Sequence, residues 1–158
     1  MPQRLMHHVD ALANRRVLVV GDIILDEYLY GTATRMSREA PIPVLEFESR
    51  KLIPGGAANP AANIVAMGSQ VVQIGLTGSD ANAAHLRAVL AEKGIDAGGL
   101  ITDDSRPTTV KTRVMAQMGL RFPQQVARMD TLSRTAIDGK IEAQIVTFIS
   151  EQIKQADA

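Results

Sequence analysis

A run of four aliphatic residues, Val17 to Val20, constrains the fold of this chain more than any other feature. Three of the four are β-branched valines, and Gly21 ends the run. Continuous apolar runs of this kind are typical of strands that are covered on both faces, as in a parallel sheet flanked by helices. The run therefore predicts the first strand of such a sheet.

The rest of the chain alternates between helix and strand patterns. The expected helices cover residues 4–13, 57–67, 80–93 and 133–155, and the expected central strands cover residues 71–76 and 100–102. Residues 110–117 and 125–129 alternate in polarity around a loop that holds Gly119 and Pro123, which predicts a hairpin. This alternation of elements predicts an α/β fold.

Two extended stretches are expected to stand apart from the central sheet. Residues 22–30 are mixed in character, whereas residues 41–48 alternate with period two, as a half-exposed strand does. Pro41 and Pro43 argue against a central position in a sheet. These stretches predict a small β-layer, which the Pro-Gly-Gly segment 54–56 is expected to end as a sharp break.

The last expected helix, over residues 133–155, has an apolar face that should feed a further strand. Parallel strands need a crossover connection, and the sequence stops at Ala158. A sheet halted at this point would expose an edge and the faces of its helices. We therefore expect the chain to be part of a larger domain or to need a partner.

Composition excludes several classes of function. Lys and Arg number 17, as do Asp and Glu, so no charge excess favours nucleic acid or an anionic membrane. The absence of cysteine excludes a disulfide scaffold and a zinc–cysteine site. Residues 1–10 lack the apolar core of a signal peptide, and no run of about 18 apolar residues is present. We expect a cytoplasmic protein without nucleic-acid or membrane partners.

The first candidate site is the segment from Gly55 and Gly56 to Asn59, at the start of an expected helix. Two glycines let the backbone approach a ligand closely, and an asparagine can both donate and accept hydrogen bonds. Free N–H groups at a helix N-terminus add further donors. This chemistry suits a hydroxyl-rich ligand. The alternative is a tight turn with an asparagine cap.

The second candidate site holds Asp22 and Asp26, which directly follow the first expected strand. Ligands of open α/β sheets bind beyond the carboxyl ends of the strands. Two carboxylates at such a place can accept hydrogen bonds from several sugar hydroxyls. The alternative is a turn with an aspartate cap and a second, solvated aspartate.

The third candidate site lies on the expected hairpin. Lys111 and Arg113 share one face of its first strand, and Arg128 and Asp130 share a face of its second strand. Paired cations on one face suit the phosphate of a substrate. The alternative is a solvated hairpin with a cross-strand ion pair.

Other segments give little sign of chemistry. His7 and His8 are adjacent near the start, and His85 lies alone on a helix. No group of His, Asp or Glu has the spacing of metal ligands, so no metal site is expected. Residues 75–80 lack the Gly-Lys-Ser/Thr ending of a P-loop, which favours a plain strand-to-helix turn.

Taken together, these segments resemble the PfkB, or ribokinase-type, carbohydrate kinases. Residues 55–61 (Gly-Gly-Ala-Ala-Asn-Pro-Ala), followed by Gly68 and Gly78, have the order and spacing of that family's first signature. The neighbouring segments look like those of heptose-7-phosphate kinases, which form the kinase part of bifunctional ADP-heptose synthase. The segments that carry this resemblance are residues 20–28, Gly31, Arg35, Ser37, 39–41, 43–44, 107–114, 124–126, Arg128 and Asp130. The resemblance covers about residues 17–130.

The resemblance implies a ribokinase-like sandwich over residues 1–158, present only as an N-terminal half, with a small β-lid inserted at about residues 22–54. It implies that sugar hydroxyls are held by Asp26, Gly55, Gly56 and Asn59, with Asp22 joining them in the heptose branch. It further implies that Lys111, Arg113 and Arg128 contact the 7-phosphate. A lid of this type closes over the sugar, excludes water and often forms homodimers.

The family's second signature, Gly-Ala-Gly-Asp with its catalytic Asp, is absent from this sequence. ATP and Mg²⁺ are expected for the full-length family enzyme, but no residue here can be assigned to them, and no catalytic residue can be named. The sequence is therefore that of a fragment of a heptose-phosphate kinase in one interpretation. The alternatives are a non-catalytic sugar-phosphate-binding or dimerisation module, or a kinase for ribose or fructose.

Overall fold

The structure of this chain is a computed structural model, and it describes residues 11–119 and 122–158. Its central sheet has the order β1-β4-β5, built from β1 (Arg16–Val20), β4 (Gln70–Thr77) and β5 (Asp96–Thr102). Both pairings are parallel, which confirms the prediction from the valine run. The strand at 100–102 is longer than predicted and begins at Asp96.

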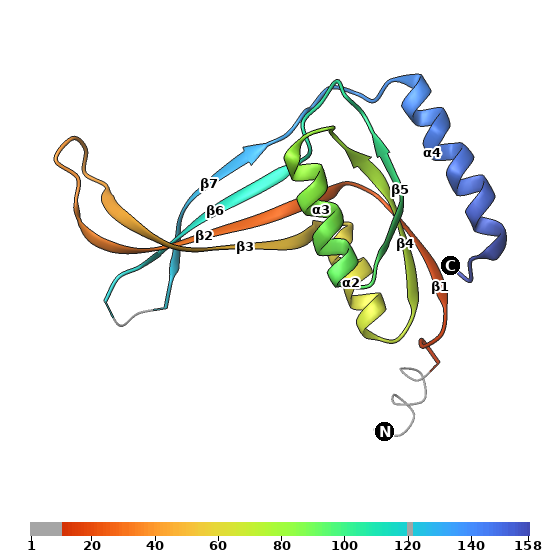
Figure 1. The fold of residues 1–158 in the computed structure, drawn as a ribbon, viewed down its shortest axis with the longest axis horizontal. Coiled ribbons are helices and arrows are strands. Elements are labelled where there is room, and N and C mark those ends of the chain that lie inside the picture. The colour runs from red at the N-terminus through yellow and green to blue at the C-terminus, as the bar shows by residue number, and fades with distance from the viewer. Residues whose placement is uncertain (1–10, 120–121) are drawn as a thin grey trace.

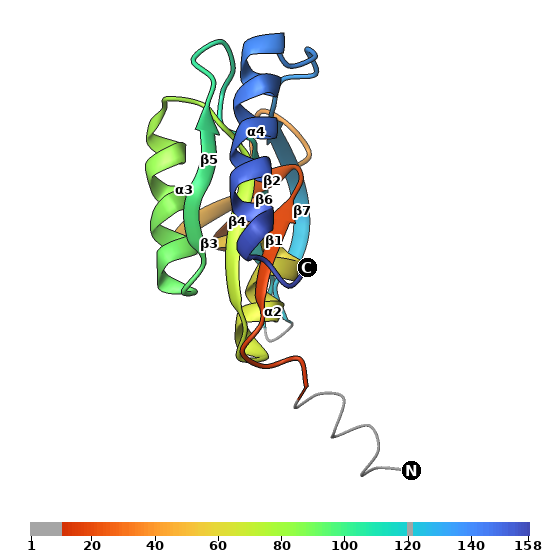
Figure 2. The ribbon, with the colours of Figure 1, turned by 90° about the vertical axis from the view of Figure 1, so that its right-hand side faces the viewer.

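Helices cover both faces of this sheet. The helices α2 (Ala58–Ala66) and α3 (Ala81–Glu92) lie on one face, and α4 (Gly139–Gln152) with the short 3₁₀ helix η1 (Ile153–Gln155) lies on the other (Figures 1 and 2). The α4 helix begins later than predicted because Asp138 caps it by accepting a hydrogen bond from the N–H of Lys140. The helix predicted over residues 4–13 lies almost entirely outside the described residues; residues 11–14 form a turn.

The remaining strands form a second sheet with the order β3-β2-β6-β7. Its strands are β2 (Ile23–Met36), β3 (Pro43–Gly56), β6 (Val110–Gln117) and β7 (Gln124–Thr131). The β6–β7 hairpin and the edge position of β3 agree with the predictions. The prediction of a break at residues 54–56 is wrong, because Pro54, Gly55 and Gly56 continue β3 and pair with residues 23–25 of β2.

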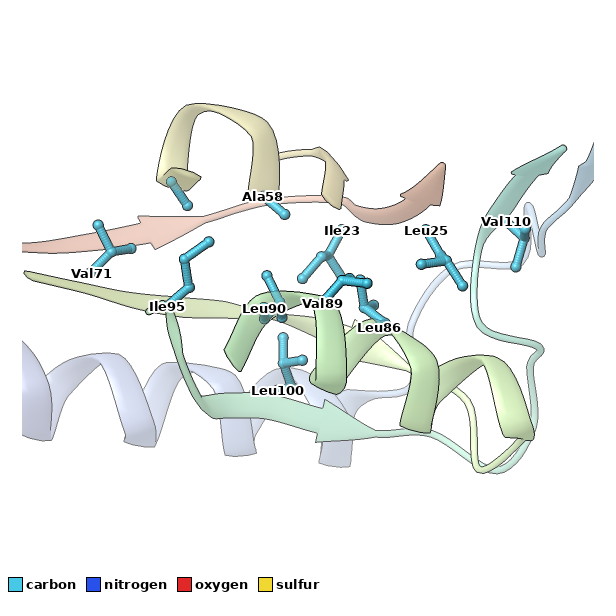
Figure 3. Close-up of a cluster of buried hydrophobic side chains, with 11 residues drawn as sticks. Ile23, Leu25, Ala58, Val71, Leu86, Val89, Leu90, Ile95, Leu100 and Val110 are labelled. Atoms are coloured by element: carbon cyan, nitrogen blue, oxygen red, sulfur yellow. The ribbon is translucent and has the colours of Figure 1, made fainter. Parts of the chain in front are cut away.

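This second sheet projects away from the helices as a long twisted ribbon of strands (Figure 1). The first residues of β2 nevertheless lie in the hydrophobic core, since Ile23 and Leu25 are 3% and 0% exposed. They pack with Leu86 and Leu90 of α3 and with Val110 at the start of β6 (Figure 3). The core therefore fixes the base of the second sheet against the central sheet. Among the described residues, no helix is long and apolar enough to cross a membrane.

Asp80 connects two parts of this fold. Its carboxylate accepts a hydrogen bond from the N–H of Ala83, which caps α3, and another from the N–H of Thr108, before β6. Burial raises the pKa of Asp80, but the hydrogen bonds from Thr108, Ala83 and Asn82 outweigh burial and hold this pKa below its ordinary value of 3.8. A depressed carboxyl pKa stabilises the fold at higher pH, and this contribution is lost as the pH falls through the folded-state pKa.

We expect Asp80→Ala to lower the free energy of unfolding by about 1–2 kcal/mol near pH 7, because a helix cap and the Thr108 contact are lost together. The difference from the unsubstituted chain should shrink at pH values below 3.8, where the carboxylate of the unsubstituted chain becomes protonated. Urea denaturation at neutral and acidic pH measures both effects, with exposed Asp104→Ala as the control. A loss that is equal at both pH values would contradict the role of the charge.

Candidate functional site

A cavity of about 450 Å³ opens at the carboxyl ends of β1 and β4. Asp22, directly after β1, and Lys111 of β6 are two of its polar lining residues, and Ile137 and Ile145 contribute apolar surface from the α4 side. This is the place where open α/β sheets bind their ligands. The structure thus brings together Asp22 and Lys111, which are 89 positions apart in the sequence.

Arg106 fixes one wall of this cavity. Its Nε lies 2.6 Å from Oδ2 of Asp103, and its guanidinium donates to the carbonyl oxygens of Thr135 and Ala136 at 3.4 and 3.3 Å. The Ser105 hydroxyl and N–H, followed by Arg106, hold the pKa of Asp103 below its usual range. Sequence reasoning missed this anchor, although an acid and an arginine three positions apart in a loop are a recognisable signal.

One face of the second sheet continues from the cavity and carries the charged residues of the site. The register places Asp26 beside Lys111 and Lys111 beside Asp130, which forms one row across β2, β6 and β7. The next row consists of Tyr28 on β2, Arg113 on β6 and Arg128 on β7. Partners in register share a face of the sheet, so six side chains form a compact array.

Within the array, Asp26 and Arg113 form a half-buried ion pair. The distance from Nη1 of Arg113 to Oδ1 of Asp26 is 2.6 Å, and the two side chains are 20% and 17% exposed. The hydrogen bond to Asp26 raises the pKa of Arg113 above its ordinary value, so this guanidinium stays charged. Its centre lies 5.2 Å from the ring centroid of Tyr28, a cation–π contact that sequence reasoning also missed.

Gly55 makes room for the Asp26 carboxylate. A Cβ atom at position 55 would lie 2.3 Å from Oδ2 and 2.7 Å from Cγ of Asp26. Carbon and oxygen cannot approach so closely, so the carboxylate can occupy this place only opposite a glycine. The first and second candidate sites of the sequence therefore meet at one contact between β2 and β3.

Gly56 joins the same two segments one residue further on. It has a φ angle of 58°, and a Cβ there would lie 2.3 Å from the carbonyl oxygen of Asp22. That oxygen accepts a hydrogen bond of 2.8 Å from the N–H of Ala57, the N-cap residue of α2. Asn59 is the second residue of α2, is exposed, and does not cap the helix. The alternative of an asparagine cap is therefore wrong, and Asn59 does not line the described cavity.

The cations of the hairpin differ in their partners. Arg128 pairs with Asp130 on its own strand, with Nε to Oδ1 at 2.9 Å and Nη2 to Oδ2 at 3.0 Å. Lys111 forms no ion pair within residues 11–119 and 122–158. Three cations and two carboxylates leave the array with a formal charge of +1. Lys51 of β3, which is in register with Tyr28 of β2, adds a cation that sequence reasoning did not include.

The sequence profile of the "pfkB family carbohydrate kinase" matches residues 14–122. The chain belongs to the pfkB family of carbohydrate kinases. The match spans β1, the glycine segment at the end of β3 and the Asp26–Arg113 pair, so the family resemblance predicted from the motifs is confirmed.

Among curated relatives, the bifunctional protein HldE of Helicobacter pylori (strain ATCC 700392 / 26695) is 38% identical over 143 residues, which are 90% of this chain and 30% of the relative. The bifunctional protein HldE of Geotalea uraniireducens (strain Rf4) is 42% identical over 137 residues, covering 87% of this chain and 27% of the relative. The chain thus spans less than a third of the length of these relatives.

A solved carbohydrate kinase from Agrobacterium tumefaciens superimposes with a TM-score of 0.65 at 20% identity, covering 90% of this chain and 43% of that chain. At this identity the likeness concerns the fold alone. It confirms the predicted ribokinase-like α/β architecture, of which this chain holds only a fraction. Among the described residues, no three His, Cys, Asp or Glu side chains gather as metal ligands.

We expect Gly55→Ala to lower the free energy of unfolding by about 1–3 kcal/mol, because the added methyl group would clash with the Asp26 carboxylate and force the carboxylate or the strand to move. Gly139→Ala is the matched control, since a Cβ at that position meets no atom within 4 Å. Chemical denaturation of both variants measures the difference. Equal stability of the two variants would show that the carboxylate does not lie against Gly55.

Proposed function

We propose that this chain is the N-terminal, sugar-binding part of an ATP-dependent kinase for D-glycero-D-manno-heptose 7-phosphate. The kinase phosphorylates the anomeric hydroxyl, a step in making ADP-heptose for the lipopolysaccharide core. The array of carboxylates and cations beside the cavity carries this proposal, because a ligand with both hydroxyls and a phosphate needs both kinds of group. The likeness to bifunctional HldE proteins supports the heptose branch.

In this proposal, Asp22 and Asp26 accept hydrogen bonds from sugar hydroxyls. Arg113 occupies Oδ1 of Asp26, whereas Oδ2 points toward Gly55 and can accept from a ligand. Gly55 and Gly56 let the ligand approach the backbone at the end of β3, and Asn59 of α2 offers its amide. Hydrogen bonds to charged groups are each worth roughly 1.5–3 kcal/mol.

The 7-phosphate is proposed to lie over the hairpin cations. Lys111 faces both the array and the cavity, and Arg128 stands diagonally from it on β7. The guanidinium of Arg113 lies beside these two cations and is already paired with Asp26. Phosphate recognition by Lys and Arg is charge-assisted, so the affinity should fall with rising salt.

ATP and Mg²⁺ would supply the transferred phosphoryl group and the charge that stabilises it during transfer. Mg²⁺ in kinases is typically held by one or two carboxylates together with the phosphates of the nucleotide, and no residue of this chain is assigned to it. The work proposed for this chain is therefore binding and orienting the sugar. A catalytic base is not assigned to any of its residues. We also propose that the protein acts in the cytoplasm, where ATP is made.

Two other functions remain as alternatives. One is a non-catalytic module that binds a sugar phosphate or forms dimers. The other is the same kinase chemistry on ribose or fructose. The cationic array favours a phosphorylated sugar over ribose, because ribose carries no anionic group for Lys111 and Arg128 to bind.

We expect calorimetry to show that the chain binds heptose 7-phosphate more tightly than ribose. Lys111→Met should lower the affinity for heptose 7-phosphate about tenfold or more, since a charge-assisted contact is lost. Lys154→Met, in the exposed η1 turn, is the control and should bind normally. A preference for ribose would refute the heptose assignment, and phosphorylation of heptose 7-phosphate by this chain with ATP would refute the view that it only binds.

We also propose that the β2–β3 pair acts as a lid over the sugar and as a homodimer contact. Three large apolar side chains near its far end are strongly exposed: Met36 is 59% exposed, Ile42 57% and Phe47 69%. Exposed apolar groups gathered on a projecting element are typical of interaction surfaces.

We expect Phe47→Ser to shift the chain from dimer toward monomer in sedimentation velocity, because buried aromatic area is lost from the contact. Met67→Ser, at the end of α2 and outside the lid, is the control and should leave the distribution unchanged. An unsubstituted chain that sediments as a monomer at every concentration would refute dimerisation through the lid.

A further inference from the structure

We infer that Arg113 acts on a bound sugar through Asp26, as a positioning residue, and that Tyr28 holds its guanidinium in place; this inference rests on the sugar-binding function proposed above. The three side chains come from neighbouring strands, Asp26 and Tyr28 from β2 and Arg113 from β6. Their contacts in the free chain carry the inference.

Arg113 is held from two directions. Its Nη1 donates to Oδ1 of Asp26 at 2.6 Å, and its guanidinium carbon lies 5.2 Å from the Tyr28 ring centroid. The Tyr28 ring is itself stacked on that of Tyr30, with centroids 6.3 Å apart and planes at 17°. A planar guanidinium that stacks on a ring and bonds a carboxylate is confined in a way that a flexible ammonium group is not.

The surroundings of Arg113 do not favour a phosphate as its direct partner. The carboxylate of Asp26 is in contact with it, and that of Asp130 is near enough to help raise its pKa. A phosphate on this guanidinium would face both negative charges. Lys111 forms no ion pair within the described ranges, so its ammonium group is not already engaged by a carboxylate and can bind a phosphate.

The geometry instead gives Arg113 a role in orienting Asp26. With Oδ1 bound to Arg113 and Oδ2 against the gap left by Gly55, the carboxylate has one defined position before any ligand arrives. Fixing an acceptor in advance reduces the ordering that binding must otherwise impose. The loss of Arg113 should therefore weaken every contact that Asp26 makes with a sugar, whether or not the sugar carries a phosphate.

Calorimetry with two ligands, D-glycero-D-manno-heptose 7-phosphate and the same heptose without phosphate, tests this directly. We expect Arg113→Gln to lower the affinity for both ligands by a similar factor, about tenfold. The same substitution in an Asp26→Asn background should cause less than about a twofold further loss, because the two residues then act as one unit. Lys111→Gln is the matched comparison and should weaken binding of the phosphorylated ligand far more than that of the unphosphorylated one, because Lys111 forms no ion pair within the described ranges.

Tyr28 supplies a second test that leaves both charges intact. Tyr28→Leu removes the aromatic ring and should lower the affinity for both ligands by a similar factor, as expected for Arg113→Gln. Tyr28→Phe keeps the ring and should bind both ligands normally. These variants decide the matter if Arg113→Gln fails to fold. A Tyr28→Leu variant that folds and binds both ligands normally would refute the role of the ring.

A loss at Arg113 confined to the phosphorylated ligand would show a direct phosphate contact, and a loss undiminished in the Asp26→Asn background would show that Arg113 acts independently of Asp26. Either result would overturn the inference alone. Failure of the unsubstituted chain to bind either heptose would overturn the proposed function, and this inference with it.

Discussion

The parallel pairing of β2 with β6 is the constraint on which the rest of the site depends. It joins Asp26 to Lys111 and Tyr28 to Arg113 across 85 positions of sequence. The same pairing carries β3 on one side and β7 on the other, so the projecting pair and the hairpin become one sheet. Because Leu25 and Val110 lie opposite each other in the hydrophobic core, burial fixes the register of β2 against β6. A slip by one residue would turn the charged residues toward the core.

Burial of apolar residues thus decides where the charges meet. The side chains of β2 alternate, with Ile23 and Leu25 turned toward α3 and Asp26 and Tyr28 on the opposite face. A half-buried pair such as Asp26 and Arg113 adds little net stability, because desolvation of the two charges offsets much of their attraction. Its effect lies in geometry, since it fixes the orientation of a carboxylate at small energetic cost.

The sequence predicted the parts of this arrangement better than their assembly. The first strand, the hairpin and the helix expected over residues 80–93 follow from local patterns, and the structure agrees with them. The parallel pairing of β2 with β6 could not be predicted, because no local signal links segments so far apart. The break expected at Gly55 and Gly56 was wrong for a related reason: the glycines that suggested a turn serve instead to admit Asp26 and the carbonyl of Asp22 beside a continuing strand. The alternative that Asn59 caps its helix is wrong, because Ala57 occupies the N-cap position and its N–H donates to the carbonyl oxygen of Asp22.

The two sheets also differ in whether their edge strands are covered by other groups. This difference bears on which strands are open to a ligand. On the central sheet, the guanidinium of Arg87 binds the carbonyl oxygens of Ala97 and Leu100 on the outer strand β5. On β1, the N–H of Leu18 donates to the carbonyl of Ala158. Occupied edges resist rearrangement and further pairing. In the second sheet, by contrast, every residue of β7 is exposed. The charged array lies between the covered central sheet and the exposed strand β7. Leu25 and Val110 hold one end of it in the core, and the side along β7 is open. Under the proposed function, a ligand that bridges the cavity and the array would therefore contact a half-buried carboxylate at one end and the exposed guanidinium of Arg128 at the other.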